Sequence, residues 1–247
     1  RSHRIDQSGD GAGTEPGCYP IGCQSGPTAV NDTFTVKKGG VLTEIASVVK
    51  DVNPGSAGAF PTSGSQLVNV SGTLYFTALK SGVGWELWKS NGTAAGTVLV
   101  KDIVAGSGSS NPAQLNNVNG TLFFTAETAT HGRELWKSNG TAAGTVMVKD
   151  IRPGSGYGFY FGLTDTLVNV NGTLFFTANN GVNGVELWKT NGTAAGMVLV
   201  KDITPGASGT NLTDLTSVGG KLFFRGPGTG SSLALWVSNG TSAGTLK

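Results

Sequence analysis

Residues 86–97 read Glu-Leu-Trp-Lys-Ser-Asn-Gly-Thr-Ala-Ala-Gly-Thr, and this stretch occurs four times in the chain of 247 residues. The second and third copies occupy residues 134–145 and 186–197, and a weaker fourth copy occupies 234–245. A unit of the type Leu-Phe-Phe precedes each copy, and Val-Lys-Asp-Ile follows the first three. Recurrence at about 50 residues is typical of architectures in which one supersecondary unit is repeated along the chain.

Each repeat reads as four short strands separated by turns. In the third repeat we expect strands at residues 167–170, 173–178, 185–189 and 198–203. The Asn-Gly at 171–172 favours a tight hairpin, because both residues tolerate positive φ. The second strand is apolar at consecutive positions, which is expected of a strand buried on both faces.

Four antiparallel strands repeated about every 48 residues match the blade of a β-propeller. The sequence therefore predicts an all-β fold, with residues 48–247 forming a propeller of four repeats. A flat β-solenoid is the competing architecture, but its coils are usually shorter than these repeats.

The two ends of the repeat region complement each other. Residues 49–55, Val-Lys-Asp-Val-Asn-Pro-Gly, have the form of a fourth strand with nothing before it, while the last repeat stops as its fourth strand begins. We therefore expect four blades, with the N-terminal strand completing the last blade so that no edge is exposed. Two alternatives remain open: the chain is cut from a longer array, or residues 49–52 complete a blade of another molecule in a head-to-tail polymer.

Composition excludes several classes of function. Lys and Arg total 17 against 15 Asp and Glu, for a net charge of +2. The chain therefore lacks the basic footprint of a nucleic-acid-binding protein. No apolar run approaches the roughly 20 residues that span a bilayer, so we expect no membrane insertion.

Residues 1–47 form a Gly- and Pro-rich arm ahead of the repeats. Cys18 and Cys23 are its two cysteines and the only ones in the chain. No further Cys or His pair completes a metal site, so a local disulfide is preferred over free thiols. Such a bond persists in an oxidising compartment, in agreement with a processed secreted form, although an excised fragment is the other interpretation. A short hairpin is expected at residues 33–43.

The motif Glu-Leu-Trp-x-x-Asn-Gly-Thr-x-x-Gly-Thr, followed by Val-x-Val-Lys-Asp-Ile, resembles the ELWxxDGT repeat family of bacterial surface and secreted proteins over about residues 48–247. The resemblance implies export, a repetitive β-rich ectodomain and no established enzymatic activity. This chain has Asn where the family usually has Asp, which weakens the expectation of calcium, and no other cofactor is expected. Residues 29–36 are similar to the opening of cadherin-like adhesin repeats, which indicates a modular surface protein.

No catalytic constellation is expected. His3 and His131 do not recur, so no base is available for a Ser-His-Asp or Cys-His arrangement. Carboxylates recur at equivalent positions of the repeats, which favours a structural role over glycoside hydrolysis; these are Glu86, Glu134, Glu186, Asp51, Asp102, Asp150 and Asp202. Residues 6–11 lack the spacing and terminal Glu of a helix-loop-helix calcium loop, so no metal site is expected there.

Two sets of candidate site residues remain. Nine asparagines lie in sequons, although Asn-Gly-Thr also suits a tight turn, and six of them are the candidates for glycosylation: Asn91, Asn139, Asn191, Asn239, Asn119 and Asn171. The repeated tryptophans favour blade packing over sugar stacking. A platform of exposed aromatic residues is expected where the repeat is broken, from Trp85, Tyr157, Tyr160 and Phe161.

These patterns favour a non-enzymatic extracellular or cell-surface β-propeller that acts in surface structure, adhesion or filament assembly. Its expected partners are other copies of itself, surface proteins or glycans. A lectin-like module with shallow sugar sites between blades is the alternative, and a hydrolase with unrecognised residues is a third hypothesis.

Overall fold

The computed structural model describes residues 48–55, 58–60, 66–159, 167–210 and 212–247. Over these ranges the protein is all-β, with four four-stranded antiparallel sheets and no helix, and hence no helix long and apolar enough to cross a membrane. The predicted all-β class is confirmed. Cys18, Cys23 and the expected hairpin at 33–43 lie outside the described residues, so the disulfide and the hairpin stay predictions.

Each sheet is built from four consecutive strands, and each strand pairs with the next one along the chain. The first sheet contains β1 (Leu67–Val70), β2 (Thr73–Lys80), β3 (Gly84–Ser90) and β4 (Val98–Lys101). The second contains β5 (Ala113–Val118), β6 (Thr121–Thr128), β7 (Gly132–Ser138) and β8 (Val146–Lys149). The third contains β9 (Val168–Val170), β10 (Thr173–Asn179), β11 (Val185–Thr190) and β12 (Val198–Lys201). The fourth contains β13 (Thr213–Val218), β14 (Lys221–Pro227), β15 (Leu233–Ser238) and β16 (Thr245–Leu246).

Asn-Gly turns connect the first two strands of the second and third sheets. Asn119 and Asn171 each have a φ of 50°, and Gly120 and Gly172 have φ values of 81° and 84°. Both turn residues therefore adopt the left-handed conformation that this tight hairpin requires. The hairpin predicted at residues 171–172 is confirmed.

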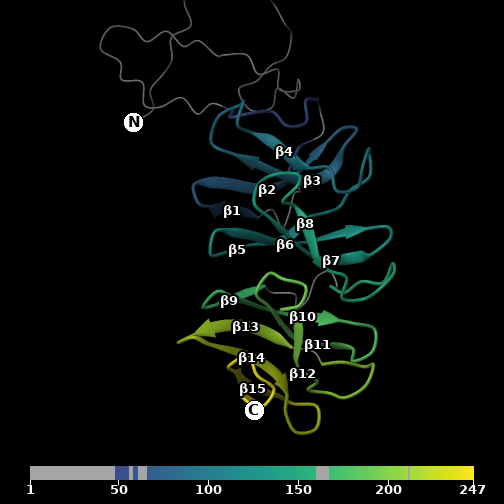
Figure 1. Ribbon diagram of the computed structural model, residues 1–247, viewed down its shortest axis with the longest axis vertical. Coiled ribbons are helices and arrows are strands. Elements are labelled where there is room, and N and C mark those ends of the chain that lie inside the picture. The colour runs from purple at the N-terminus through teal and green to yellow at the C-terminus, as the bar shows by residue number, and fades with distance from the viewer. Residues whose placement is uncertain (1–47, 56–57, 61–65, 160–166, 211) are drawn as a thin grey trace, which may run out of the picture.

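The four sheets follow one another in chain order along the longest axis of the molecule, with the first and fourth sheets at opposite ends (Figure 1). We call the face turned toward the next sheet in the chain the forward face, and the opposite one the backward face. On the forward face of the third sheet, Phe175 and Leu187 pack against Leu222 and Phe224 of the fourth. The core therefore consists of apolar layers between sheets.

Strand β10 shows how one strand serves two of these layers. Phe175 lies in the layer shared with the fourth sheet, whereas Leu174 and Phe176 lie in the layer shared with the second. Phe175 and Phe176 are 4% and 0% exposed. Adjacent strand residues point to opposite faces, so consecutive apolar residues bury both. The predicted burial of this strand on two faces is confirmed.

The expectation that the N-terminal strand completes the last sheet is wrong. Residues 49–52 form no strand, and the fourth sheet carries its own fourth strand, β16, beside β15. Instead, Lys50 donates a hydrogen bond from Nζ to the carbonyl of Thr97 in the first sheet, at 2.8 Å, and Val52 is buried against Phe76. Because the first and fourth sheets lie at opposite ends of the stack, this segment cannot serve both, and the ring is not closed in this structure.

Residues 48–55 and 58–60 contact the first sheet in the same way that each linker between two sheets contacts the sheet that follows it. Three later lysines donate from Nζ to a carbonyl of the next sheet as Lys50 does: Lys101 to Thr145 at 2.9 Å, Lys149 to Met197 at 3.3 Å and Lys201 to Thr245 at 2.7 Å. Linker carbonyls also accept an amide of the next second strand: Ala59 from Leu79, Ser110 from Glu127 and Gly158 from Asn179. Residues 48–55 and 58–60 therefore occupy the place of a linker ahead of the first sheet.

Candidate binding pockets between the sheets

A buried glutamate ties each linker to the sheet before it. Glu134 accepts hydrogen bonds from the amides of Ile151 and Arg152, at 3.1 and 3.2 Å. The other two glutamates make equivalent bonds: Glu86 with the amides of Ile103, Val104 and Ser110 and the Ser110 hydroxyl, and Glu186 with the amides of Ile203 and Thr204 and the Thr210 hydroxyl. All three residues are 0% exposed. Their carboxylates are therefore engaged by the chain itself.

Burial raises the pKa of all three glutamates, and it raises that of Glu134 to about 8. The main cause is the loss of hydration, which disfavours the charged carboxylate. The amide donors act in the opposite direction, because they stabilise the charged form. The charge of Asp150 raises the pKa of Glu134 further.

The repeated tryptophans pack on the backward faces of their sheets, against the preceding sheet or, for Trp88, against Val52 ahead of the first sheet. Trp88, Trp136 and Trp188 are 3%, 9% and 7% exposed. Trp236 of the fourth sheet is half-buried, and its Nε1 donates to the carbonyl of Pro227 at 3.0 Å. The indole rings therefore contribute to the apolar layers, which is the packing role predicted for them.

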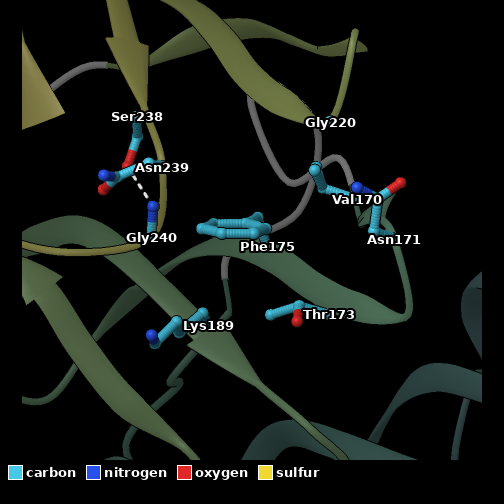
Figure 2. A pocket seen from close by; sticks show the side chains of 9 residues that line it. All are labelled: Val170, Asn171, Thr173, Phe175, Lys189, Gly220, Ser238, Asn239 and Gly240. Carbon is cyan, nitrogen blue, oxygen red and sulfur yellow. Dashed lines mark hydrogen bonds between the residues drawn. The ribbon is translucent and has the colours of Figure 1, made fainter. Parts of the chain in front are cut away.

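A small pocket of about 200 Å³ opens between the third and fourth sheets. Figure 2 shows the ring of Phe175 at its centre, between Thr173 and Lys189 of the third sheet and the loop at Asn239 and Gly240 of the fourth. A hydroxyl, an ammonium group and an amide thus surround one aromatic ring. This arrangement can hold a small polar molecule with an apolar face.

The junction between the second and third sheets repeats this pocket at about 220 Å³, lined by Phe123, Lys137 and Asn191 among others. Here the Nζ of Lys137 donates to the carbonyl of Gly192 at 2.8 Å. At the junction of the first two sheets Tyr75 replaces the phenylalanine, and a Cβ on Gly140 would lie 2.3 Å from its hydroxyl oxygen. The tyrosine hydroxyl therefore occupies the space beside the loop.

Glycine is required where the aromatic ring of one sheet meets the loop of the next. Gly192 and Gly240 have φ values of 88° and 85°. A Cβ at these positions would lie 2.9 and 3.0 Å from Cζ of Phe123 and Phe175. The Asn-Gly-Thr motif therefore serves both the turn and the contact between sheets.

The Asn-Gly-Thr loops share one set of internal hydrogen bonds. Asn91 Oδ1 accepts from the amide and hydroxyl of Thr93, at 3.1 and 2.8 Å, and the same bonds recur at Asn139, Asn191 and Asn239. These four asparagines are exposed, as are Asn119 and Asn171 in the hairpin turns. Glycosylation of these six asparagines stays a prediction. No group of three metal-ligating side chains occurs in the described ranges.

The predicted aromatic platform is not assembled from its described members. Trp85 is half-buried on β3 of the first sheet, and Tyr157 is 43% exposed in the linker after the second sheet. No ring contact joins these two side chains among the residues described. Tyr160 and Phe161 lie outside the described residues.

The pocket residues Phe175 and Lys189 were not predicted from the sequence as site residues. The sequence did contain a signal for this site: when two phenylalanines are adjacent on one strand, one of them must face each neighbouring sheet. Lys189 shares the forward face with Leu187, since the two are separated by one residue on β11.

No protein-family model matches this chain, and no curated protein matches it.

The buried glutamates predict how stability depends on pH. Because their pKa is raised in the folded state, the folded chain binds more protons than the unfolded chain between pH values of about 5 and 8. We expect the free energy of unfolding to be greatest at the acidic end and about 1–3 kcal/mol lower at the alkaline end. Urea unfolding at a series of pH values measures this.

The matched variant is Glu134→Gln, which is uncharged throughout. Its loss of stability between the same pH values is expected to be smaller than that of the parent chain. A stability that rises with pH, or an unchanged slope in the variant, would contradict this assignment.

Proposed function

We propose that this chain is a non-enzymatic extracellular protein that acts in surface structure, adhesion or filament assembly. The observation that carries the proposal is the use of its repeated residues. The glutamates hold linkers, the tryptophans fill the layers, and the lysines bind carbonyls of the next sheet. Residues that recur from repeat to repeat thus maintain the stack, as expected of a protein that forms an extended repetitive surface.

The four sheets are proposed to be blades in one sector of a β-propeller. The first strands of neighbouring sheets approach one another, β1 with β5, β5 with β9 and β9 with β13. Strands nearest the axis of a propeller meet in this way. The resemblance of the Glu-Leu-Trp motif to ELWxxDGT repeats supports both this architecture and export.

Location tests the proposed function. We expect antibodies raised against residues 67–247 to label the outside of intact producing cells, or material shed from them, in immunogold electron microscopy. Permeabilised cells serve as the control for total antigen. Labelling confined to the cytoplasm would rule out a role in surface structure or adhesion.

A second candidate function is carbohydrate binding, favoured by the recurring pockets. An aromatic ring flanked by hydroxyl, amide and ammonium groups is suited to a sugar. At about 200 Å³, the pocket is smaller than the roughly 300–1,000 Å³ of pockets for drug-sized ligands. It therefore suits a single sugar ring rather than an oligosaccharide.

A glycan array distinguishes this candidate from the structural role. If the pocket beside Phe175 binds sugar, the parent chain should bind a defined set of terminal sugars and Lys189→Ala should lose about tenfold or more in affinity. Lys80→Ala, on β2 of the first sheet, is a control expected to bind as the parent does. Failure of the parent chain to bind any glycan would leave the structural role alone.

A further inference from the structure

The forward face of the fourth sheet exposes side chains that are buried at every internal junction. Leu235 is 65% exposed, whereas its three equivalents are 0% exposed: Leu87, Leu135 and Leu187. Val218 is 55% exposed, whereas its equivalents Val118 and Val170 are 5% and 6% exposed. The fourth sheet therefore carries the forward half of a junction without the sheet that would cover it.

The backward face of the first sheet carries the other half. Leu67 is 62% exposed, whereas its equivalents Leu115, Leu167 and Leu215 are 5%, 4% and 5% exposed. A mainly apolar groove of about 780 Å³ opens here, lined by Leu67, Leu74, Phe76 and Phe60 among others. It lies where a preceding sheet would pack.

The loop glycine of the first sheet, Gly92, lacks the aromatic ring that its equivalents face. At the internal junctions the loop glycine of each sheet faces an aromatic tip of the sheet before it: Gly140 faces Tyr75, Gly192 faces Phe123 and Gly240 faces Phe175. The equivalent Gly92 of the first sheet has nothing within 4 Å of a Cβ built on it. The fourth sheet presents Phe223 at the position of Phe123 and Phe175, so its forward face offers the ring that this groove lacks.

The polar residues of the two exposed faces are also compatible with contact between them. Ala234 replaces the linker-binding glutamate on the fourth sheet, and Val237 replaces the lysine that reaches the next loop. On the first sheet, the amide of Asn53 is bonded to Asp51 Oδ1, at 3.1 Å, instead of to a glutamate. Contact between the two faces therefore requires no carboxylate at the position of these glutamates, and Arg225, which lies opposite Leu235 on the forward face, is already paired with Asp214.

Residues 48–55 and 58–60 do not block the groove against an incoming sheet. They already occupy the place of a linker, with Lys50 bound to Thr97. The fourth sheet has a fourth strand of two residues, Thr245–Leu246. A fourth sheet seated in the groove would place residues 49–52 of the receiving molecule beside its β15, in the position that the end of a longer fourth strand takes within the chain.

We infer that the backward face of the first sheet binds the forward face of the fourth sheet of a second copy of this chain, so that copies associate head to tail. The contact continues the junction that occurs three times within the chain. It is heterologous, so successive copies close into a ring or extend into a filament. The inference deepens the assembly role within the proposed function.

Sedimentation velocity over a wide range of concentrations tests the contact, using the parent chain and two face variants. Leu67→Asp alters the groove and Leu235→Asp alters the forward face of the fourth sheet. Both side chains are exposed in the single chain, so neither change disturbs its core. The parent is expected to form dimers or larger species, and each variant alone to remain monomeric.

A one-to-one mixture of the two variants is the decisive sample. Each retains the face that the other lacks, so the mixture is expected to form dimers and nothing larger. Val182→Asp is the matched control, because Val182 is 70% exposed and lies in the loop between β10 and β11, away from both faces. It is expected to associate as the parent does.

Three results would overturn the inference: a parent chain that stays monomeric throughout, variants that still associate on their own, or a mixture that remains monomeric while the parent associates. Surface labelling of cells is measured separately. A negative sedimentation result would therefore not contradict the extracellular role, and a negative labelling result would not contradict the contact between copies.

Discussion

The packing of one sheet on the next is the interaction on which this structure depends. A four-stranded sheet with apolar residues on both faces cannot bury both of them alone, so each repeat needs a neighbour on either side. Phe175 and Phe176 show the consequence, since adjacent residues of one strand serve two different layers. Hydrogen bonds within each sheet hold its strands together, and the apolar layers between sheets hold the four sheets together.

Polar groups fix how neighbouring sheets are placed in relation to each other. Lys101, Lys149 and Lys201 reach forward to carbonyls of the following sheet, while Glu86, Glu134 and Glu186 hold the linker that leads there. Apolar packing alone has little directional preference. The buried carboxylates cost hydration free energy, which is visible in their raised pKa, and their bonds to successive amides fix the path of the linker.

Much of the fold could be predicted because its signals are local. The Asn-Gly hairpin, the strand boundaries of the third repeat to within two residues, and the burial of β10 on two faces follow from short patterns in the sequence. The sheet on which residues 49–52 dock could not be predicted in this way. The segment Val-Lys-Asp-Val at 49–52 has the pattern of a fourth strand wherever it docks, and only the position of Thr97 relative to Lys50 shows that it lies on the first sheet. The pockets were missed for a similar reason, because they form between a ring of one repeat and a loop of the next.

The claim that contact between sheets stabilises the molecule is tested most directly by the same substitution at two equivalent positions. Leu135 is 0% exposed and Leu235 is 65% exposed. Urea unfolding of dilute protein should show that Leu135→Ala lowers the free energy of unfolding by about 2–5 kcal/mol, and that Leu235→Ala changes it by less than about 0.5 kcal/mol. Equal effects at the two positions would contradict the account, because each leucine would then contribute through its own sheet and not through the neighbour that covers it.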